Sequence, residues 1–145
     1  MRAIRSDLAS AKKGEFMINY RSYAFAFGVV FIIVGLLGFI PAVTPNGMLL
    51  GIFHVNTAHN LVHLLSGIVA IFCSKQSIAA SRMYFLVFGT IYGLVALLGF
   101  TLKDPLLFGL IANNRADAWL HLAIAITSLG LGVQGLSRPS MKHVP

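Results

Sequence analysis

Apolar residues run almost unbroken through four segments of the chain, and charged residues gather between them. The segments cover roughly residues 22–40, 56–73, 83–102 and 116–136. Each is close to the ~20 residues that a helix needs to cross a ~30 Å hydrocarbon layer. None alternates between apolar and polar positions as a strand of a membrane barrel does. The pattern therefore predicts an all-α, four-helix transmembrane bundle.

Composition supports a membrane protein and excludes several other classes. Of the 145 residues, 57% are hydrophobic and 10% charged, and the mean hydropathy is +0.83, whereas a soluble domain is about half apolar and about a quarter charged. Too few polar side chains are present to cover a water-soluble enzyme. The net charge of +7 comes without the mixture of basic and aromatic residues that marks nucleic-acid binding. The expected partner is the lipid bilayer, not nucleic acid.

The positions of the basic residues predict the orientation of the bundle. Nine of the eleven lysines and arginines lie before residue 22, between residues 75 and 82, or after residue 137. Only Lys103 and Arg115 lie in the other two connections. Because basic residues concentrate in cytoplasmic loops, we expect both termini to be cytoplasmic and the loops at 41–55 and 103–115 to face outward.

Little of the chain lies outside the predicted spans. Residues 1–16 are polar and basic, and Met17 is an alternative start, so this segment is interpreted as a cytoplasmic tail or a start-site extension. Residues 17–138 are predicted to form the membrane domain, and residues 139–145 a second cytoplasmic tail. No connection between spans exceeds about fifteen residues, which leaves no room for a folded extramembrane domain.

The chain also contains an internal similarity. Shifted by 61 residues, the Leu-Leu-Gly-Phe run at 36–39 matches the run at 97–100. We predict two tandem helical hairpins, repeat one at about 22–73 and repeat two at about 83–136, related by a pseudo-two-fold axis along the membrane normal. Shifted by 58 residues, one polar motif matches another: Asn56, His59 and His63 match Asn114, Asp117 and His121.

These polar motifs are the candidates for chemistry. Their residues are spaced three and four apart, so each motif lies on one face of its helix. Ionisable groups within a membrane usually face the bundle interior and pair with one another. Imidazole and carboxylate groups ligate zinc, iron, copper or manganese. One interpretation of the motifs is therefore a metal site formed by His59, His63, Asp117 and His121.

Other interpretations stay open for the same residues. A tetrapyrrole would lie between the second and fourth helices with His63 and His121 as axial ligands. Without any cofactor, the polar groups would fasten the helices by hydrogen bonds, or form part of a proton or solute path. Asp117 is also a candidate helix cap, as are Asn56 and Asn114, because Asp and Asn are preferred at that position.

Small and aromatic residues suggest how the helices pack. Gly28 and Gly35 on the first predicted helix, and Gly89 on the third, allow close approach of a neighbouring helix. Such faces serve packing within the chain, a homo-oligomer or a larger membrane complex. Tyr84 and Trp119 are expected to anchor the protein at the membrane interfaces.

The two polar motifs also carry a resemblance to a known family. The segments at 56–67 and 114–122 are similar to the HNxxHLxxG and DxxLHL elements of an uncharacterised bacterial family, the domain of unknown function numbered four-three-eight-three. The resemblance covers about residues 20–136. Ala125 stands where that family commonly has a glycine. The resemblance implies a small multi-pass protein of the bacterial inner membrane, with the two motifs as its signature, and implies no activity.

Together these observations predict the general role of the protein. The chain has four acidic residues and lacks the HExxH, nucleophile-elbow, phosphate-loop and dinucleotide motifs, so an enzyme is not favoured. We expect a structural or accessory subunit of a membrane assembly. The alternative is a cofactor protein that binds a metal or haem-like group through His59, His63, Asp117 and His121.

Overall fold

The computed structural model describes residues 19–102 and 104–134. These residues form four α-helices: α2 (Tyr20–Leu37), α3 (Thr57–Gln76), α4 (Ile78–Thr101) and α5 (Arg115–Gln134). All four are long and apolar enough to cross a membrane. The predicted all-α, four-helix class is confirmed, and the protein is a multi-pass membrane protein. The predicted tails at 1–16 and 139–145 lie outside the described residues.

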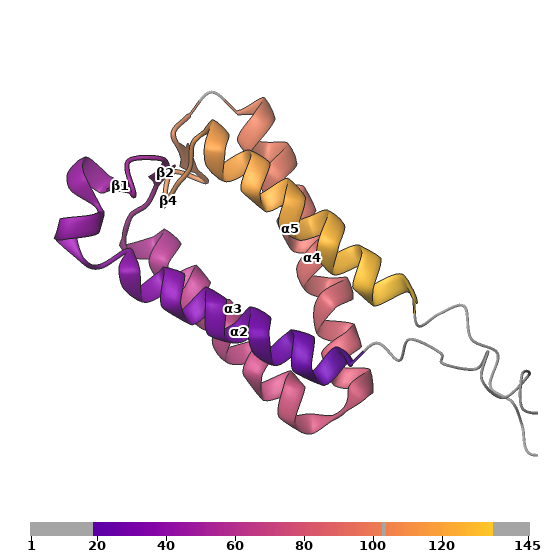
Figure 1. Ribbon diagram of the computed structural model, residues 1–145. Coiled ribbons are helices and arrows are strands. Elements are labelled where there is room, and N and C mark those ends of the chain that lie inside the picture. The colour runs from indigo at the N-terminus through magenta and orange to yellow at the C-terminus, as the bar shows by residue number, and fades with distance from the viewer. Residues whose placement is uncertain (1–18, 103, 135–145) are drawn as a thin grey trace, which may run out of the picture.

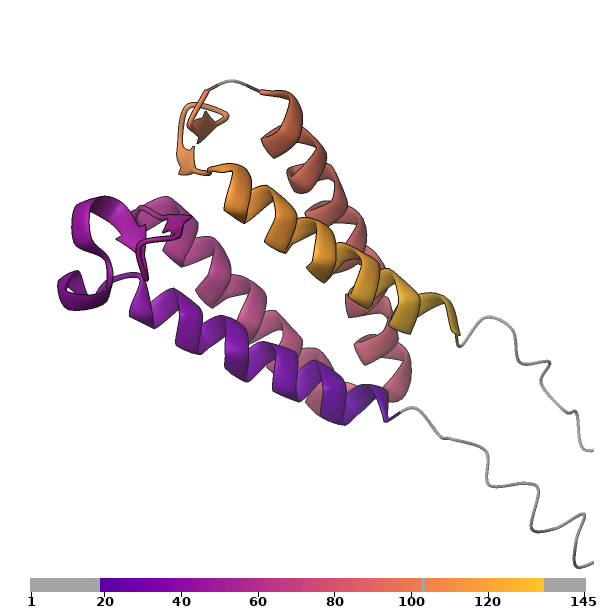
Figure 2. The ribbon, with the colours of Figure 1, turned by 45° about the horizontal axis from the view of Figure 1, so that its top comes forward.

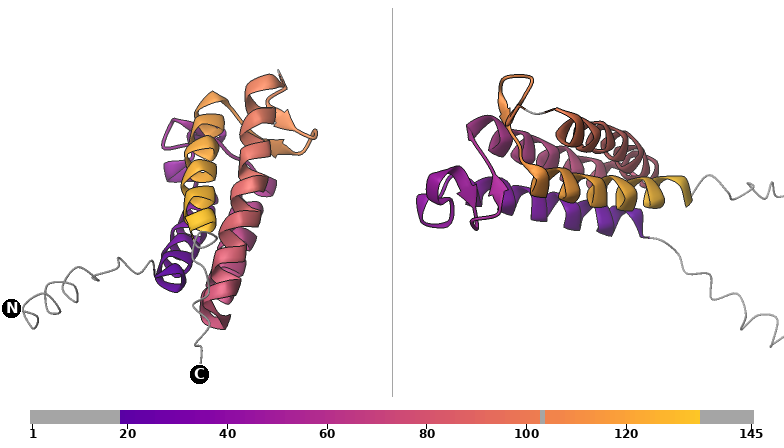
Figure 3. Two further views of the ribbon diagram at one scale, coloured as in Figure 1. Left: turned by 90° about the vertical axis from the view of Figure 1, so that its right-hand side faces the viewer. Right: turned by 90° about the horizontal axis from the view of Figure 1, so that it is seen from above.

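The helices pack as two pairs. Helix α2 lies along α3, and α4 lies along α5, with smaller contacts from α4 to α2 and α3 (Figures 1 and 2). The four helices run broadly along one direction (Figure 3). The start of α2, the end of α5 and the connection between α3 and α4 lie at one end of the bundle, and the other two connections lie at the opposite end (Figure 1). An even number of spans with short connections produces this arrangement.

The connection between α3 and α4 is a single residue, Ser77. Its side chain accepts a hydrogen bond from the N–H of Ala80 at 3.0 Å and so caps the start of α4. Its backbone N–H donates to the carbonyl oxygen of Cys73 and caps the end of α3. Helix α4 therefore begins at Ile78, five residues before the apolar run that predicts it. The early turns contain Arg82, whose Nε donates to the carbonyl oxygen of Gly132, so a polar residue lies within the helix.

The two connections at the other end form short β-hairpins where the sequence predicted only loops. The first pairs β1 (Met48–Leu49) with β2 (Phe53–His54), after 3-10 turns at Pro41–Val43 and Pro45–Gly47, and the second pairs β3 (Leu106–Leu107) with β4 (Ile111–Ala112). In each hairpin, two consecutive residues of the turn have positive φ. Leu50 and Gly51 have φ of 54° and 72°, and Phe108 and Gly109 have 55° and 68°. This conformation matches a type I′ turn, which suits the twist of a tight hairpin.

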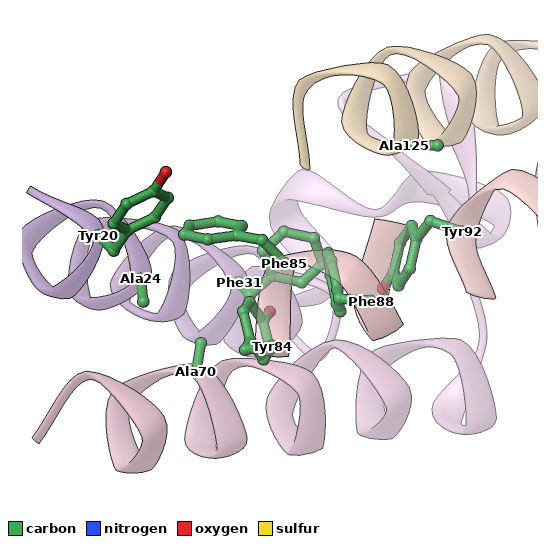
Figure 4. Packing of buried hydrophobic residues seen from close by; sticks show 9 residues of the cluster. All are labelled: Tyr20, Ala24, Phe31, Ala70, Tyr84, Phe85, Phe88, Tyr92 and Ala125. Atoms are coloured by element: carbon green, nitrogen blue, oxygen red, sulfur yellow. The ribbon is translucent and has the colours of Figure 1, made fainter. Parts of the chain in front are cut away.

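Aromatic side chains fill the centre of the bundle (Figure 4). Phe31 of α2 meets Phe88 and Tyr92 of α4 edge to face, with ring centroids 5.1 and 5.6 Å apart. Tyr84 stacks on Phe88 at 4.8 Å and is only 6% exposed, so its predicted role as an interfacial anchor is wrong. Trp119 is 63% exposed, as an anchor requires.

Glycines bring paired helices into close contact. A Cβ on Gly28 of α2 would lie 2.7 Å from the carbonyl oxygen of Gly67 of α3, and a Cβ on Gly67 would lie 2.7 Å from that of Gly28. A Cβ on Gly89 of α4 would lie 2.9 Å from the backbone nitrogen of Leu129 of α5. These glycines therefore serve packing within the chain. The predicted oligomer or larger complex stays a prediction.

A contact near the starts of α2 and α4 recurs in the two helix pairs. Arg21 Nε donates to the carbonyl oxygen of Ser74 at 2.7 Å, and Arg82 Nε donates to that of Gly132 at 2.8 Å. The two arginines are 61 residues apart and their two acceptors 58 apart. The same offsets relate the sequence motifs, so these contacts support the predicted duplication.

Candidate metal centre

Three of the four predicted metal ligands come together between the helix pairs. His59 and His63 lie one turn apart on α3, and His121 lies on α5. One ring nitrogen from each falls within 4.8 Å of the others. The side chains are buried, with 4%, 6% and 5% of their surface exposed. A buried group of three imidazoles has the donor atoms and the spacing to hold one metal ion.

Hydrogen bonds determine how His59 presents its ring. Its Nδ1 lies 2.7 Å from the carbonyl oxygen of Ala112 in β4. Because a carbonyl oxygen only accepts, Nδ1 carries the proton, and Nε2 of the neutral ring keeps a lone pair. That Nε2 lies 2.9 Å from Nε2 of His63. A metal-ligating histidine commonly uses such a backbone carbonyl to hold its other nitrogen in place.

The other two histidines have nitrogens without a partner. Nδ1 of His63 and Nδ1 of His121 are buried and accept or donate no hydrogen bond within the described part of the chain. Phe31 stacks on His63 with centroids 5.1 Å apart, and Tyr92 meets the ring of His121 edge to face at 5.2 Å. These aromatic side chains fix the orientation of both imidazole rings. They form no hydrogen bond with Nδ1 of either histidine. An unsatisfied buried nitrogen is unfavourable, so the cluster as it stands is incomplete in its polar contacts.

Asp117 is buried nearby but has a different role. Its Oδ2 accepts the N–H of Asn114 at 2.8 Å and the N–H of His54 at 3.0 Å. Asn114 Oδ1 in turn accepts the N–H of Asp117 at 3.0 Å. This reciprocal pair is a capping box at the start of α5. The structure thus places Asp117 in the capping alternative and outside the group of three histidines.

The two asparagines of the motifs cap their helices and reach across to the opposite hairpin. Asn56 Oδ1 accepts the N–H of His59 at 2.9 Å, and its Nδ2 donates to the carbonyl oxygen of Leu110 at 2.8 Å. Asn114 Nδ2 donates to the carbonyl oxygen of Ile52, also at 2.8 Å. The start of α3 is therefore hydrogen-bonded to the hairpin that precedes α5, and the start of α5 to the hairpin that precedes α3. These bonds hold both hairpins at the end of the bundle where the histidines lie.

The space shared by the three histidines is small. A cavity of about 70 Å³ touches all three rings and is otherwise lined mainly by apolar side chains of α3, α4 and the second hairpin. Pockets that hold an organic ligand of cofactor size measure roughly 300–1,000 Å³. A space of this volume suits a single ion and is too small for a tetrapyrrole between His63 and His121, although a separate apolar depression of about 400 Å³ reaches His63 alone of the three histidines.

Several residues of the site carry no signal in the sequence. Ala112 contributes only its carbonyl oxygen, which any residue possesses, and His54 contributes only its backbone N–H to Asp117. Phe31 and Tyr92 look like ordinary core aromatics. One signal was present: His54 and Ala112 are separated by the same 58 residues that relate the two polar motifs.

Comparison with known proteins assigns the family. Searches of the curated proteins and of the solved structures find no match. The family described as Domain of unknown function (DUF4383) matches residues 21–134. Apart from Tyr20, the first residue of α2, that range includes all four helices, both hairpins and the three histidines. A match over most of the chain shows that this protein belongs to the DUF4383 family.

Proposed function

We propose that this protein is a non-enzymatic membrane protein that binds one transition-metal ion through His59, His63 and His121. The observation that carries the proposal is the convergence of three buried ring nitrogens within 4.8 Å. Zinc, copper, iron and nickel all accept imidazole ligands. Because α3 supplies two ligands and α5 the third, a bound ion would link the two helix pairs.

Two of the three ligand nitrogens already lie near the separation that one ion requires, and that of His121 must move closer, because the group spans up to 4.8 Å. Metal–nitrogen bonds of ~2.0–2.1 Å in a tetrahedral site put two ligand nitrogens roughly 3.3 Å apart. The Nε2 atoms of His59 and His63 are 2.9 Å apart, so the two rings need to separate by only a few tenths of an ångström. Three protein ligands also leave one position open, as in catalytic zinc sites.

The described acidic residues argue against hydrolytic chemistry at this site. Asp117 accepts two backbone N–H groups in its cap, and Asp104 accepts the N–H of Leu106 at 2.8 Å. Neither carboxylate serves as a general base beside the histidines. A binding role therefore accounts for these residues better than catalysis does.

A second candidate is a structural or accessory subunit in which the cluster fastens helices without an ion. The bonds from His59 to Ala112 and to His63 favour it, because they hold the ring without any metal. Polar contacts between membrane helices contribute roughly 0.6 kcal/mol each on average. No hydrogen bond ties His121 of α5 to the two histidines of α3 among the described residues, which weighs against this candidate as the whole explanation.

We also infer the cellular location from the charge pattern and the family. The protein would lie in the inner membrane of a bacterial cell, with both termini in the cytoplasm and the histidine cluster near the outward face. This orientation follows from the rule that basic residues concentrate in cytoplasmic loops.

Elemental analysis of the purified protein tests the metal proposal. The protein is extracted in detergent without chelator, and its metal content is compared with that of His63→Ala and His54→Ala. His54 is the matched control, since it is a histidine of the same chain outside the group of three. We expect close to one ion per chain in the wild type and in His54→Ala, and little in His63→Ala. Absence of metal from all three proteins, also after incubation with zinc, copper or iron, would favour the fastening role.

A further inference from the structure

We propose that the open position of this metal centre binds a neutral diatomic molecule, of the class of dioxygen and carbon monoxide, within the membrane. The inference rests on the proposed function, because the ion supplies the bond to the ligand. The cavity beside the histidines carries the rest of the inference. Its size, its lining and its surroundings each restrict what can bind there.

The first restriction is size. The cavity that touches His59, His63 and His121 has a volume of about 70 Å³. On this measure one water molecule needs about 10–15 Å³, so the space admits a few small molecules at most. An organic substrate would need a pocket of roughly 300 Å³ or more. A ligand of two heavy atoms fits beside an ion that sits close to the three nitrogens.

The second restriction is polarity. Apart from the histidines and Tyr92, the cavity is lined by aliphatic and aromatic side chains, among them Val62, Val95, Leu107 and Ile111. No lysine or arginine of the described residues lines it. A charged or strongly hydrogen-bonding ligand would lose its hydration there with only the ion and the imidazole nitrogens as compensation. A neutral diatomic molecule needs only the bond to the ion.

The third restriction concerns the route of entry. Ile91 of α4 lines the cavity and also lines a larger apolar depression of about 500 Å³ between α3 and α4. Its side chain is 51% exposed on the helix surface, where a membrane protein meets lipid. Nonpolar molecules favour an apolar environment over water, so a dissolved gas can reach Ile91 from the hydrocarbon layer. The position of Ile91 assigns the entry of the ligand to the lipid side.

The test uses copper in its reduced state and carbon monoxide as the probe. The full-length protein is loaded anaerobically with Cu(I), the bound copper is quantified first, and carbon monoxide is then added while the C–O stretch is followed by infrared spectroscopy. Carbon monoxide binds without a change in oxidation state. We expect one C–O band that saturates at about one molecule per bound copper.

Two matched variants locate the ligand. Val95→Phe fills the cavity, and Val133→Phe adds the same bulk at a surface position of α5 that is 47% exposed. We expect Val95→Phe to keep its copper and to bind carbon monoxide at least tenfold more weakly, and Val133→Phe to behave as the wild type. Ile111→Phe fills the same cavity from the hairpin and replaces Val95→Phe if circular dichroism shows that the latter is unfolded.

The outcomes separate the two proposals. Failure of the wild type to bind copper would contradict the metal proposal itself. Stoichiometric copper without a C–O band would overturn the diatomic ligand and leave the metal proposal standing. A C–O band of unchanged affinity in the cavity-filling variant would show that the ligand binds elsewhere, which would also overturn the inference.

Discussion

His59 and Asp117 occupy matching positions of α3 and α5, and each binds the matching residue of the opposite hairpin. His59 Nδ1 donates to the carbonyl oxygen of Ala112 at 2.7 Å, whereas Asp117 Oδ2 accepts the N–H of His54 at 3.0 Å. The helix pair of α3 thus uses an imidazole as the hydrogen-bond donor to the opposite hairpin. The helix pair of α5 uses a carboxylate as the hydrogen-bond acceptor. The difference makes the centre asymmetric, because His59 still offers Nε2 to the cluster while Asp117 completes a helix cap.

Removing the carboxylate of Asp117 is expected to destabilise the fold and to leave metal binding intact. Asp117→Ala leaves the N–H groups of His54 and Asn114 without their acceptor, and hydrogen bonds to charged groups contribute about 1.5–3 kcal/mol each. The free energy of unfolding, measured in detergent by denaturant titration, should fall by at least that amount. The exposed Asp104, which accepts one N–H, gives a matched control in Asp104→Ala with a smaller loss. Loss of metal from folded Asp117→Ala would instead make Asp117 a ligand.

The two asparagines should contribute similar stability. Asn56→Ala and Asn114→Ala each remove a helix cap and one bond to the opposite hairpin. Loss of a cap costs about 0.5–2 kcal/mol, and each variant should lose about 2 kcal/mol once the second bond is included. Asn19→Ala, which removes only a cap on Ser22, serves as the control with a smaller effect. A difference between the first two variants well above 1 kcal/mol would argue against matching roles.

Close packing of α2 on α3 predicts the effect of a single methyl group. In Gly67→Ala the new Cβ would lie 2.7 Å from the carbonyl oxygen of Gly28 and 3.0 Å from the nitrogen of Ile32, so the helices must move apart. Overpacking of this kind typically costs about 1–3 kcal/mol. Gly130→Ala in α5 is the matched control, since its Cβ meets nothing within 4 Å, and it should gain up to about 1 kcal/mol of helix propensity. Thermal unfolding of both variants in the same detergent checks the pair, and equal stability would contradict the close contact.

The predicted orientation is tested by cysteine labelling in intact cells. In a Cys73→Ala background, Asn46→Cys lies at the hairpin end of the bundle and Gln76→Cys at the end of α3. A membrane-impermeant maleimide should label Asn46→Cys from outside and should label Gln76→Cys only after lysis. The reverse pattern would overturn the inferred orientation.

The helices were predictable from the sequence because a span is a local property. Twenty apolar residues in a row suffice to cross the hydrocarbon layer whatever their neighbours are. The beginning of α4 was less predictable, since Arg82 finds a carbonyl oxygen on α5 that no local pattern reveals. Tyr84 was misplaced for a similar reason, as its burial depends on the packing of α4 against α3.

The site was predictable only in part. The spacing of His59 and His63 puts them on one face of a helix, and the matching motif points to His121. The hairpins were not predictable, because Leu50 and Phe108 adopt positive φ without the Asn or Asp that usually marks such a turn. The separation of Asp117 from the histidines depends on those hairpins, whose backbone supplies its partner.

X-ray absorption spectroscopy at the edge of the bound metal tests the central claim most directly. The claim predicts that each bound ion has three imidazole nitrogens at about 2.0–2.1 Å in the wild type. In His121→Ala each bound ion should have two. A first shell without imidazole, or one that is identical in His121→Ala, would contradict a centre built from His59, His63 and His121.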